Sequence, residues 1–120
     1  MAGVYKSEGV LFFSDSNTSA PETVTSVAGT YQALASDQTL AVDTSAARTI
    51  TLALAADFLN KELKIGDATG GGATNNITIS MTASDTLNGA AGGASIQIDW
   101  GWLVVKATAA GEYVVVGGTL

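Results

Sequence analysis

The chain has 120 residues and a formal net charge of −6, with 11 acidic and 5 basic side chains. This length fits one domain that buries roughly two thirds of its unfolded surface, and the acidic surface would be repelled by DNA or anionic lipid. The absence of cysteine and histidine excludes disulfides, the usual zinc sites, and Ser-His-Asp or Cys-His catalysis. Only 7% of the residues are aromatic. We therefore expect a thin core that gains further burial by oligomerisation.

The N-terminal segment differs in composition from the rest. A hydrophobic cluster lies within it, made of Val10, Leu11, Phe12 and Phe13. A polar, serine-rich stretch and the only proline follow. We predict an N-terminal arm and linker over residues 1–30 and a β-domain over residues 31–120. The cluster has three interpretations: an edge strand of the same domain, an anchor on a neighbouring chain, or a disordered segment.

Short alternations of apolar and polar residues, separated by turn residues, make up most of the chain. They predict strands at 23–27, 31–35, 39–43, 48–54, 62–66, 77–81, 95–98, 101–108 and 113–116. Only residues 55–61 carry a helical signal, which is too short for a stable helix. The pattern predicts an all-β fold, a small antiparallel β-sandwich or barrel of about 8–10 short strands.

Two glycine-containing stretches separate predicted strands. Asn88-Gly89 indicates a tight turn, because both residue types tolerate positive φ. Residues 67–75 contain three successive glycines but lack the lysine of a phosphate loop and the spaced carboxylates of a calcium loop. We expect a flexible hairpin loop there.

Four aspartates beside loops are the candidates for acid–base chemistry: Asp43, Asp67, Asp85 and Asp99. No spacing brings two of them together in a cleft, so turn formation and surface solvation are the favoured roles. Arg48, the only arginine, is expected to form a salt bridge with Asp43 or Asp57. We predict no catalytic residue, no cofactor and no metal site, and therefore no enzyme.

Trp100 and Trp102 flank Gly101 and would project to one face of a regular strand. We interpret them as core or subunit-contact residues; the alternative is an exposed pair that stacks on sugar rings. Gly101 indicates close backbone approach or a bulge.

Six blocks occur in order along the chain, at residues 42–45, 48–52, 63–68, 75–79, 85–89 and 111–115. Together they resemble a β-rich module of tailed-bacteriophage virion surface proteins, over roughly residues 34–117. The resemblance implies a homotrimer. It leaves the N-terminal segment uncovered.

Within that family, the chain is similar in scale to capsid decoration (cement) proteins. The resemblance then implies a protein made in the host cytoplasm that binds the outer capsid surface of the virion as a trimer. Its partner would be the major capsid protein, with neither nucleic acid nor membrane involved, and Val10, Leu11, Phe12 and Phe13 are the capsid-contact candidates. The alternative is a tail-fibre, baseplate or receptor-binding module that recognises a host surface glycan.

Overall fold

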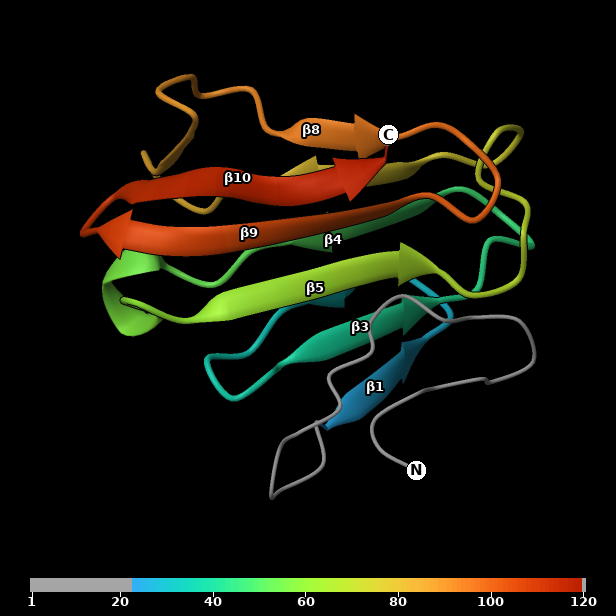
Figure 1. The fold of residues 1–120 in the computed structure, drawn as a ribbon, viewed down its shortest axis with the longest axis horizontal. Helices are drawn as coiled ribbons and strands as arrows, with labels where there is room; N and C mark the ends of the chain where they lie inside the picture. The colour runs from blue at the N-terminus through green and yellow to red at the C-terminus, as the bar shows by residue number, and fades with distance from the viewer. Residues whose placement is uncertain (1–22, 120) are drawn as a thin grey trace.

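The structure, a computed structural model, describes residues 23–119 and is a two-layer β-sandwich (Figure 1). The larger sheet has six strands, in the order β1 (Val24–Val27), β3 (Thr39–Val42), β5 (Glu62–Asp67), β9 (Trp102–Ala109), β10 (Glu112–Thr119) and β7 (Thr86–Leu87). The smaller sheet has four, in the order β2 (Tyr31–Gln32), β4 (Arg48–Thr51), β6 (Ile77–Ser80) and β8 (Ala94–Ile96). A 3₁₀ turn, η2 (Ala55–Asp57), lies within the predicted helical stretch. The predicted all-β character is confirmed, and of the two predicted alternatives, sandwich and barrel, the two sheets form a sandwich.

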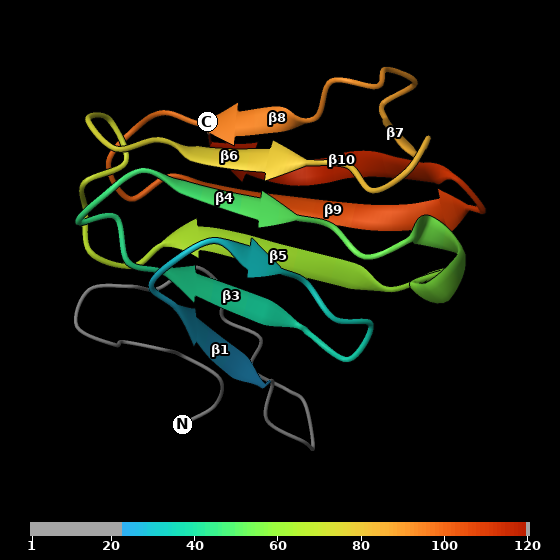
Figure 2. The same cartoon turned by 180° about the vertical axis from the view of Figure 1, so that it is seen from behind.

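The first six strands alternate between the two sheets. β1, β3 and β5 are parallel neighbours in the larger sheet, and β2, β4 and β6 are parallel neighbours in the smaller one. The chain therefore winds as a flattened coil, in which each turn (here called a rung) gives one strand to each sheet (Figure 2). Antiparallel strands end the coil: β8 pairs with β6, and the β9–β10 hairpin pairs with β5.

The predicted antiparallel arrangement is wrong for most of this fold. Five of the eight strand pairings among residues 23–119 are parallel. Parallel neighbours need a long crossover connection, and here each crossover passes through a strand of the opposite sheet. Alternation in the sequence sets which face a side chain takes, but it does not set the direction of the neighbouring strand.

The β-domain also begins earlier than the boundary predicted at residue 31. β1 pairs with β3 along its whole length, from Val24 opposite Thr39 to Val27 opposite Val42. Val27 is 3% exposed and belongs to the core. Residues 24–27 are thus part of the sheet and not of a separate arm.

The inward-facing residues of both sheets form one core. Its aliphatic members include Leu40, Val42, Ile50, Leu52, Leu63, Ile65, Ile77, Ile79, Leu103 and Val105. The aromatic members are Phe58 and Tyr113, whose ring centroids lie 6.1 Å apart. The Tyr113 hydroxyl donates a hydrogen bond to the carbonyl oxygen of Ala53 at 2.8 Å. Burial, together with the nearby carboxylates of Asp85 and Asp57, raises the pKa of Tyr113 to about 12.

The Asn88-Gly89 turn forms as predicted. Asn88 and Gly89 have φ of 53° and 82°. The backbone groups of Leu87 and Ala90 exchange two hydrogen bonds across them, at 2.8 and 3.0 Å. This is a two-residue turn with positive φ at both central positions, as an Asn-Gly pair favours.

Candidate functional site

The most highly organised polar group in the described chain is the carboxylate of Asp67, at the end of β5. Its side chain is buried, with 1% of its surface exposed. It accepts five hydrogen bonds, from the hydroxyl of Thr44 (2.7 Å) and the backbone N–H groups of Thr69 (3.1 Å), Gly70 (2.8 Å), Gly72 (2.8 Å) and Trp100 (2.9 Å). These donors come from three separate stretches of chain, so one side chain fixes three loops at this end of the sandwich.

Two opposing effects set the charge state of Asp67. Burial favours the neutral acid and raises the pKa, while hydrogen bonds from Thr44 and from the backbone of Trp100, Thr69 and Gly70 favour the carboxylate. The hydrogen bonds outweigh the burial, so the pKa of Asp67 is lower than its ordinary value of 3.8. Asp67 is therefore an ionised structural group at neutral pH.

The three glycines after Asp67 are each required by a different neighbour. A Cβ on Gly70 would lie 2.7 Å from indole carbon Cε2 of Trp100, and one on Gly71 would lie 2.7 Å from the carbonyl oxygen of Thr44. A Cβ on Gly72 would collide with the carbonyl oxygen of Ile98. Since no real Cβ is found so close to backbone or ring atoms, this stretch is a packed junction.

The prediction of a flexible hairpin loop at residues 67–75 is therefore wrong. The segment joins β5 to β6, which lie in different sheets. Its backbone is held by Asp67 and by hydrogen bonds from the N–H groups of Thr74 and Asn75 to the carbonyl oxygen of Gly71, at 3.1 and 2.8 Å.

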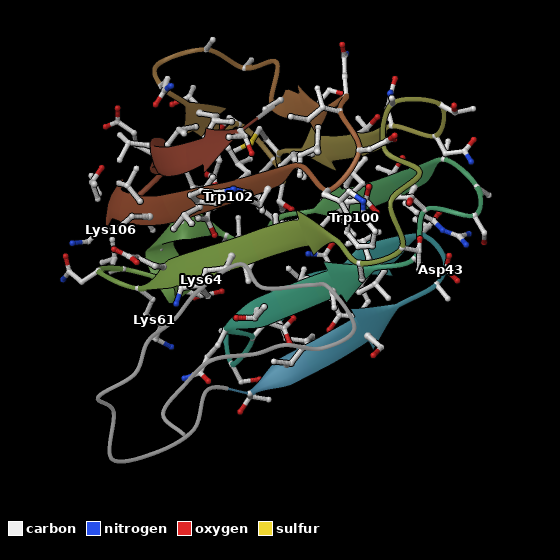
Figure 3. The ribbon with its side chains drawn as sticks, turned by 45° about the vertical axis from the view of Figure 1, so that its right-hand side comes forward. Asp43, Lys61, Lys64, Trp100, Trp102 and Lys106 are labelled. Carbon is white, nitrogen blue, oxygen red and sulfur yellow. The ribbon has the colours of Figure 1, made fainter. Side chains whose placement is uncertain are left out.

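The two tryptophans do not share a regular strand. Trp100 has φ of 62° and lies in the turn before β9, whereas Trp102 is the first residue of β9 (Figure 3). Trp100 is 48% exposed, with its indole over Gly70. Trp102 lies on the outer face of the larger sheet, because Leu103 next to it points into the core, and its ring lies over Gly117. Neither is a core residue, so that part of the prediction is wrong; the subunit-contact interpretation stays a prediction.

Gly101 allows the close approach that the sequence indicated. A Cβ there would lie 2.6 Å from Cγ2 of Ile96 and 2.9 Å from the carbonyl oxygen of Thr119. The approach brings the loop after β8 onto the end of β10.

Two further buried aspartates fix other loops in the same way. Asp37 accepts hydrogen bonds from the Tyr31 hydroxyl and the Leu34 N–H, both at 2.8 Å. Asp85 accepts one from the Ala55 N–H at 2.8 Å. Burial, with the neighbouring Asp37, raises the pKa of Tyr31. No motif in the sequence distinguishes Asp37, because its partners come together only once the chain is folded.

The other candidate carboxylates also serve local backbone. Asp43 accepts a hydrogen bond from the Ser45 N–H at 2.8 Å, and Asp99 accepts one from the Ala73 N–H at 3.0 Å. Arg48 contacts Asp43 through the backbone, since its Nε donates to the Asp43 carbonyl oxygen at 2.7 Å. Within residues 23–119, no group of three or more acidic, histidine or cysteine side chains has a metal-binding arrangement.

A pocket of about 300 Å³ lies at the opposite end of the sandwich. It is lined by Ala35, Ser36, Asp37, Gln38, Lys61 and Glu62. Lys61 Nζ donates a hydrogen bond to the carbonyl oxygen of Ala35 at 3.0 Å. The two loops that flank the pocket are thereby joined across it.

Large apolar side chains are exposed around the described domain. Those between 40% and 55% exposed are Val24, Leu34, Leu54, Leu59, Ile98, Trp100 and Val116. Leu34 and Leu54 follow the neighbouring parallel strands β2 and β4, so they lie at the same end of the smaller sheet. Apolar groups gathered at one end of a domain are typical of protein contact surfaces. The predicted capsid-contact residues Val10, Leu11, Phe12 and Phe13 lie outside the described residues.

Comparison with protein-family models finds no matching family, and comparison with curated proteins finds no similar sequence. Across residues 23–119, no helix has the length and apolar character needed to span a membrane.

Replacing Asp67 by asparagine tests the role of its carboxylate. The change keeps the size of the side chain but replaces one acceptor oxygen by an NH₂ group. That group then faces N–H donors: those of Gly72 and Trp100 if it replaces Oδ2, or those of Thr69 and Gly70 if it replaces Oδ1. We expect the free energy of unfolding to fall by about 2–4 kcal/mol, as measured by urea denaturation. Asp43→Asn is the matched control and should change stability little, because Asp43 is only half-buried and its remaining oxygen can still accept from the Ser45 N–H. Its other partners, the hydroxyl groups of Ser45 and Thr69, can rotate to accept from the new NH₂ group. Equal effects of the two substitutions would contradict the role assigned to Asp67.

The lowered pKa of Asp67 also predicts a pH dependence. Because the folded-state pKa lies below the ordinary value of 3.8, the stabilisation is fully present above about pH 4. It is lost as the pH falls from there through the folded-state pKa. Urea midpoints measured from pH 7 down to pH 2.5 should fall more steeply below pH 4 for the natural chain than for Asp67→Asn. Parallel curves would show that Asp67 binds its proton equally well in the folded and unfolded chains.

Proposed function

We propose that this chain is a structural protein of a tailed-bacteriophage virion, a capsid decoration (cement) protein. It binds the outer capsid surface as a homotrimer, contacts the major capsid protein and stabilises the shell. It acts without enzymatic activity, cofactor, nucleic acid or membrane, after synthesis in the host cytoplasm. The proposal rests on the resemblance stated above and on one structural observation.

That observation is the contrast between the polar and the apolar side chains of the domain. The buried carboxylates of Asp37, Asp67 and Asp85 accept hydrogen bonds from the domain's own loops. Apolar side chains such as Leu34 and Leu54, which are 55% and 40% exposed, face outward instead. Large apolar side chains that are exposed on a domain whose loops are fixed by buried carboxylates are suited to contacts between proteins.

Charge and multivalency favour the outside of a capsid. Three copies at −6 each would carry −18, which is compatible with an outer surface and unfavourable beside packaged DNA. Three weak contacts held in one rigid trimer bind about 10²–10⁴ times more tightly than one contact alone. A small, thin-cored domain gains stability from the same association.

Light scattering and particle binding test this function together. The natural chain should have three times its monomer mass and should coat tailed-phage capsids, seen by electron microscopy as density on the capsid faces. Leu34→Asp/Leu54→Asp should weaken assembly or coating by about tenfold or more. Thr74→Asp is the control, because Thr74 is an exposed residue of the loop at the opposite end of the sandwich. A stable monomer that leaves capsids bare would overturn the proposal.

A second candidate function is glycan recognition by a tail-fibre, baseplate or receptor-binding module. The observation that favours it is Trp100, whose indole is 48% exposed and lies over Gly70 in a loop held by Asp67. A ring fixed in this way offers its free face for stacking on a sugar.

A glycan array tests this second function. The natural chain should bind a host surface glycan, and Trp100→Ala should reduce that binding by about tenfold or more. Trp100→Phe, which keeps an aromatic face, should retain most of it. In electron micrographs the protein would then lie on the tail. An array with no binding above background removes this candidate.

A further inference from the structure

We propose that copies of this chain join head to tail, with the exposed indole of Trp100 in one copy receiving the side chains of Lys61 and Lys106 of a second copy. The inference rests on the proposed homotrimer and names the two surfaces that would build it. The Trp100 surface comprises Ile98, Asp99 and Trp100, and the lysine surface comprises Leu59, Lys61 and Lys106.

The backbone of Trp100 has a conformation that suits glycine better than tryptophan. The N–H group of Gly101 donates a hydrogen bond to the carbonyl oxygen of Ile98 at 3.1 Å, which closes a turn with Asp99 and Trp100 at its centre. Of these two central residues only Trp100 has a positive φ, at 62°. That position of a turn favours glycine or asparagine, and a bulky side chain there is strained. A tryptophan at such a position points to a use for its ring outside the turn.

The indole is held in place while much of it stays exposed. The Trp100 N–H is bound to the buried Asp67 carboxylate at 2.9 Å. A Cβ on Gly70 would lie 2.7 Å from the ring atoms Cε2 and Cζ2, so the indole fits only because Gly70 has no side chain. Trp100 is nevertheless 48% exposed, and Ile98 beside it is 40% exposed. A fixed, exposed aromatic ring loses little entropy on binding and is typical of the residues that dominate protein interfaces.

The charges around this ring favour a cationic partner group. Asp43 accepts a hydrogen bond from the Thr69 hydroxyl, next to Gly70, and Asp99 accepts one from the backbone of the same loop. Arg48, whose Nε donates to the Asp43 carbonyl oxygen, offsets one of the two carboxylates. An aromatic face with carboxylates beside it attracts an ammonium group, which can also lie over the ring.

The lysine surface lies on the side of the ribbon away from Trp100 (Figure 3). Leu59 forms a bridge with Ala107, and the Ala107 N–H donates a hydrogen bond to the Lys61 carbonyl oxygen at 3.3 Å, so both residues lie beside Lys106. Lys106 projects from the outer face of the larger sheet, because its neighbours Val105 and Ala107 belong to the core. Leu59 is 42% exposed. An apolar side chain beside two ammonium groups complements an indole beside carboxylates.

The two surfaces of one chain are too far apart to meet each other. Lys106 lies opposite Glu62 at the start of β5, whereas Trp100 is bound to Asp67 at the end of β5. The intervening length of strand is about 17 Å. A contact between the two surfaces therefore joins two copies. Because each copy contributes a different surface, such a contact is heterologous, the kind from which a ring of three copies is built.

Two conservative double variants each remove one surface. Trp100→Gly/Asp99→Asn removes the indole and the charge beside it, while glycine suits the turn and the asparagine oxygen still accepts from the backbone. Lys61→Gln/Lys106→Gln removes both positive charges and keeps polar side chains. Each variant alone should associate at least tenfold more weakly than the natural chain, measured as molar mass against concentration by light scattering.

Thr78→Gln is the control for these variants. Thr78 lies on the outer face of the smaller sheet, since its neighbours Ile77 and Ile79 belong to the core, and it is in neither surface. This variant should assemble as the natural chain does. If the two double variants also assemble as the natural chain does, the inference is overturned.

Mixing the two double variants identifies the head-to-tail contact. Each variant keeps the surface that the other lacks, so an equimolar mixture should form a dimer with one copy of each. If the mixture stays monomeric while the natural chain forms a trimer, the inference is overturned and the proposed homotrimer stands.

The mixed dimer forms without virus particles, so its outcome is separate from that of the virion function. If the dimer forms but the natural chain leaves capsids bare, the inference stands and the proposed function fails. The contact covers the indole, so an assembled natural chain that binds a glycan through Trp100 would overturn the inference. A natural chain that stays monomeric would overturn it as well.

Discussion

The carboxylate of Asp67 is the interaction on which the rest of the structure depends most. It stands where the chain leaves β5 for the opposite sheet, at a point where backbone N–H groups lose the partners of the sheet ladder. Buried N–H groups must find acceptors, and Asp67 supplies them to Thr69, Gly70, Gly72 and Trp100. Because Trp100 precedes β9, the same side chain joins the last rung of the coil to the antiparallel hairpin that ends it.

A coil of parallel strands explains why buried aspartates recur. Every rung crosses between sheets, and each crossing turns backbone groups away from the ladder. Asp37 fixes the loop after β2, as Asp67 fixes the loop after β5, by accepting a hydrogen bond from the Leu34 N–H. Asp85, after β6, accepts one from the Ala55 N–H at the start of η2. Hydrogen bonds to buried aspartates thus supplement the apolar core by fixing the crossings.

Local rules predicted part of this fold, and distant contacts decided the rest. The strands predicted from alternation at 39–43 and 77–81 both form, and their alternate residues Leu40, Val42, Ile77 and Ile79 are fully buried. Asn88-Gly89 formed its turn because the required φ values are a property of those two residues. The role of Gly70 depended on Trp100, thirty residues away, and Asp67 bonds to Thr44 and Trp100 across 23 and 33 residues. Strand direction was not encoded in alternation either, so the parallel coil could not be predicted from it.

A domain fixed in this way is a rigid support for exposed apolar side chains, which is the property that assembly on a virion surface would use. Such rigidity requires the Asp67 junction to be as stable as the core. Native-state hydrogen exchange of the Gly72 and Trp100 amides measures it most directly. Both amides should exchange only through global unfolding, at the rate of the Leu103 amide in the core. Exchange as fast as that of an exposed loop amide would contradict it.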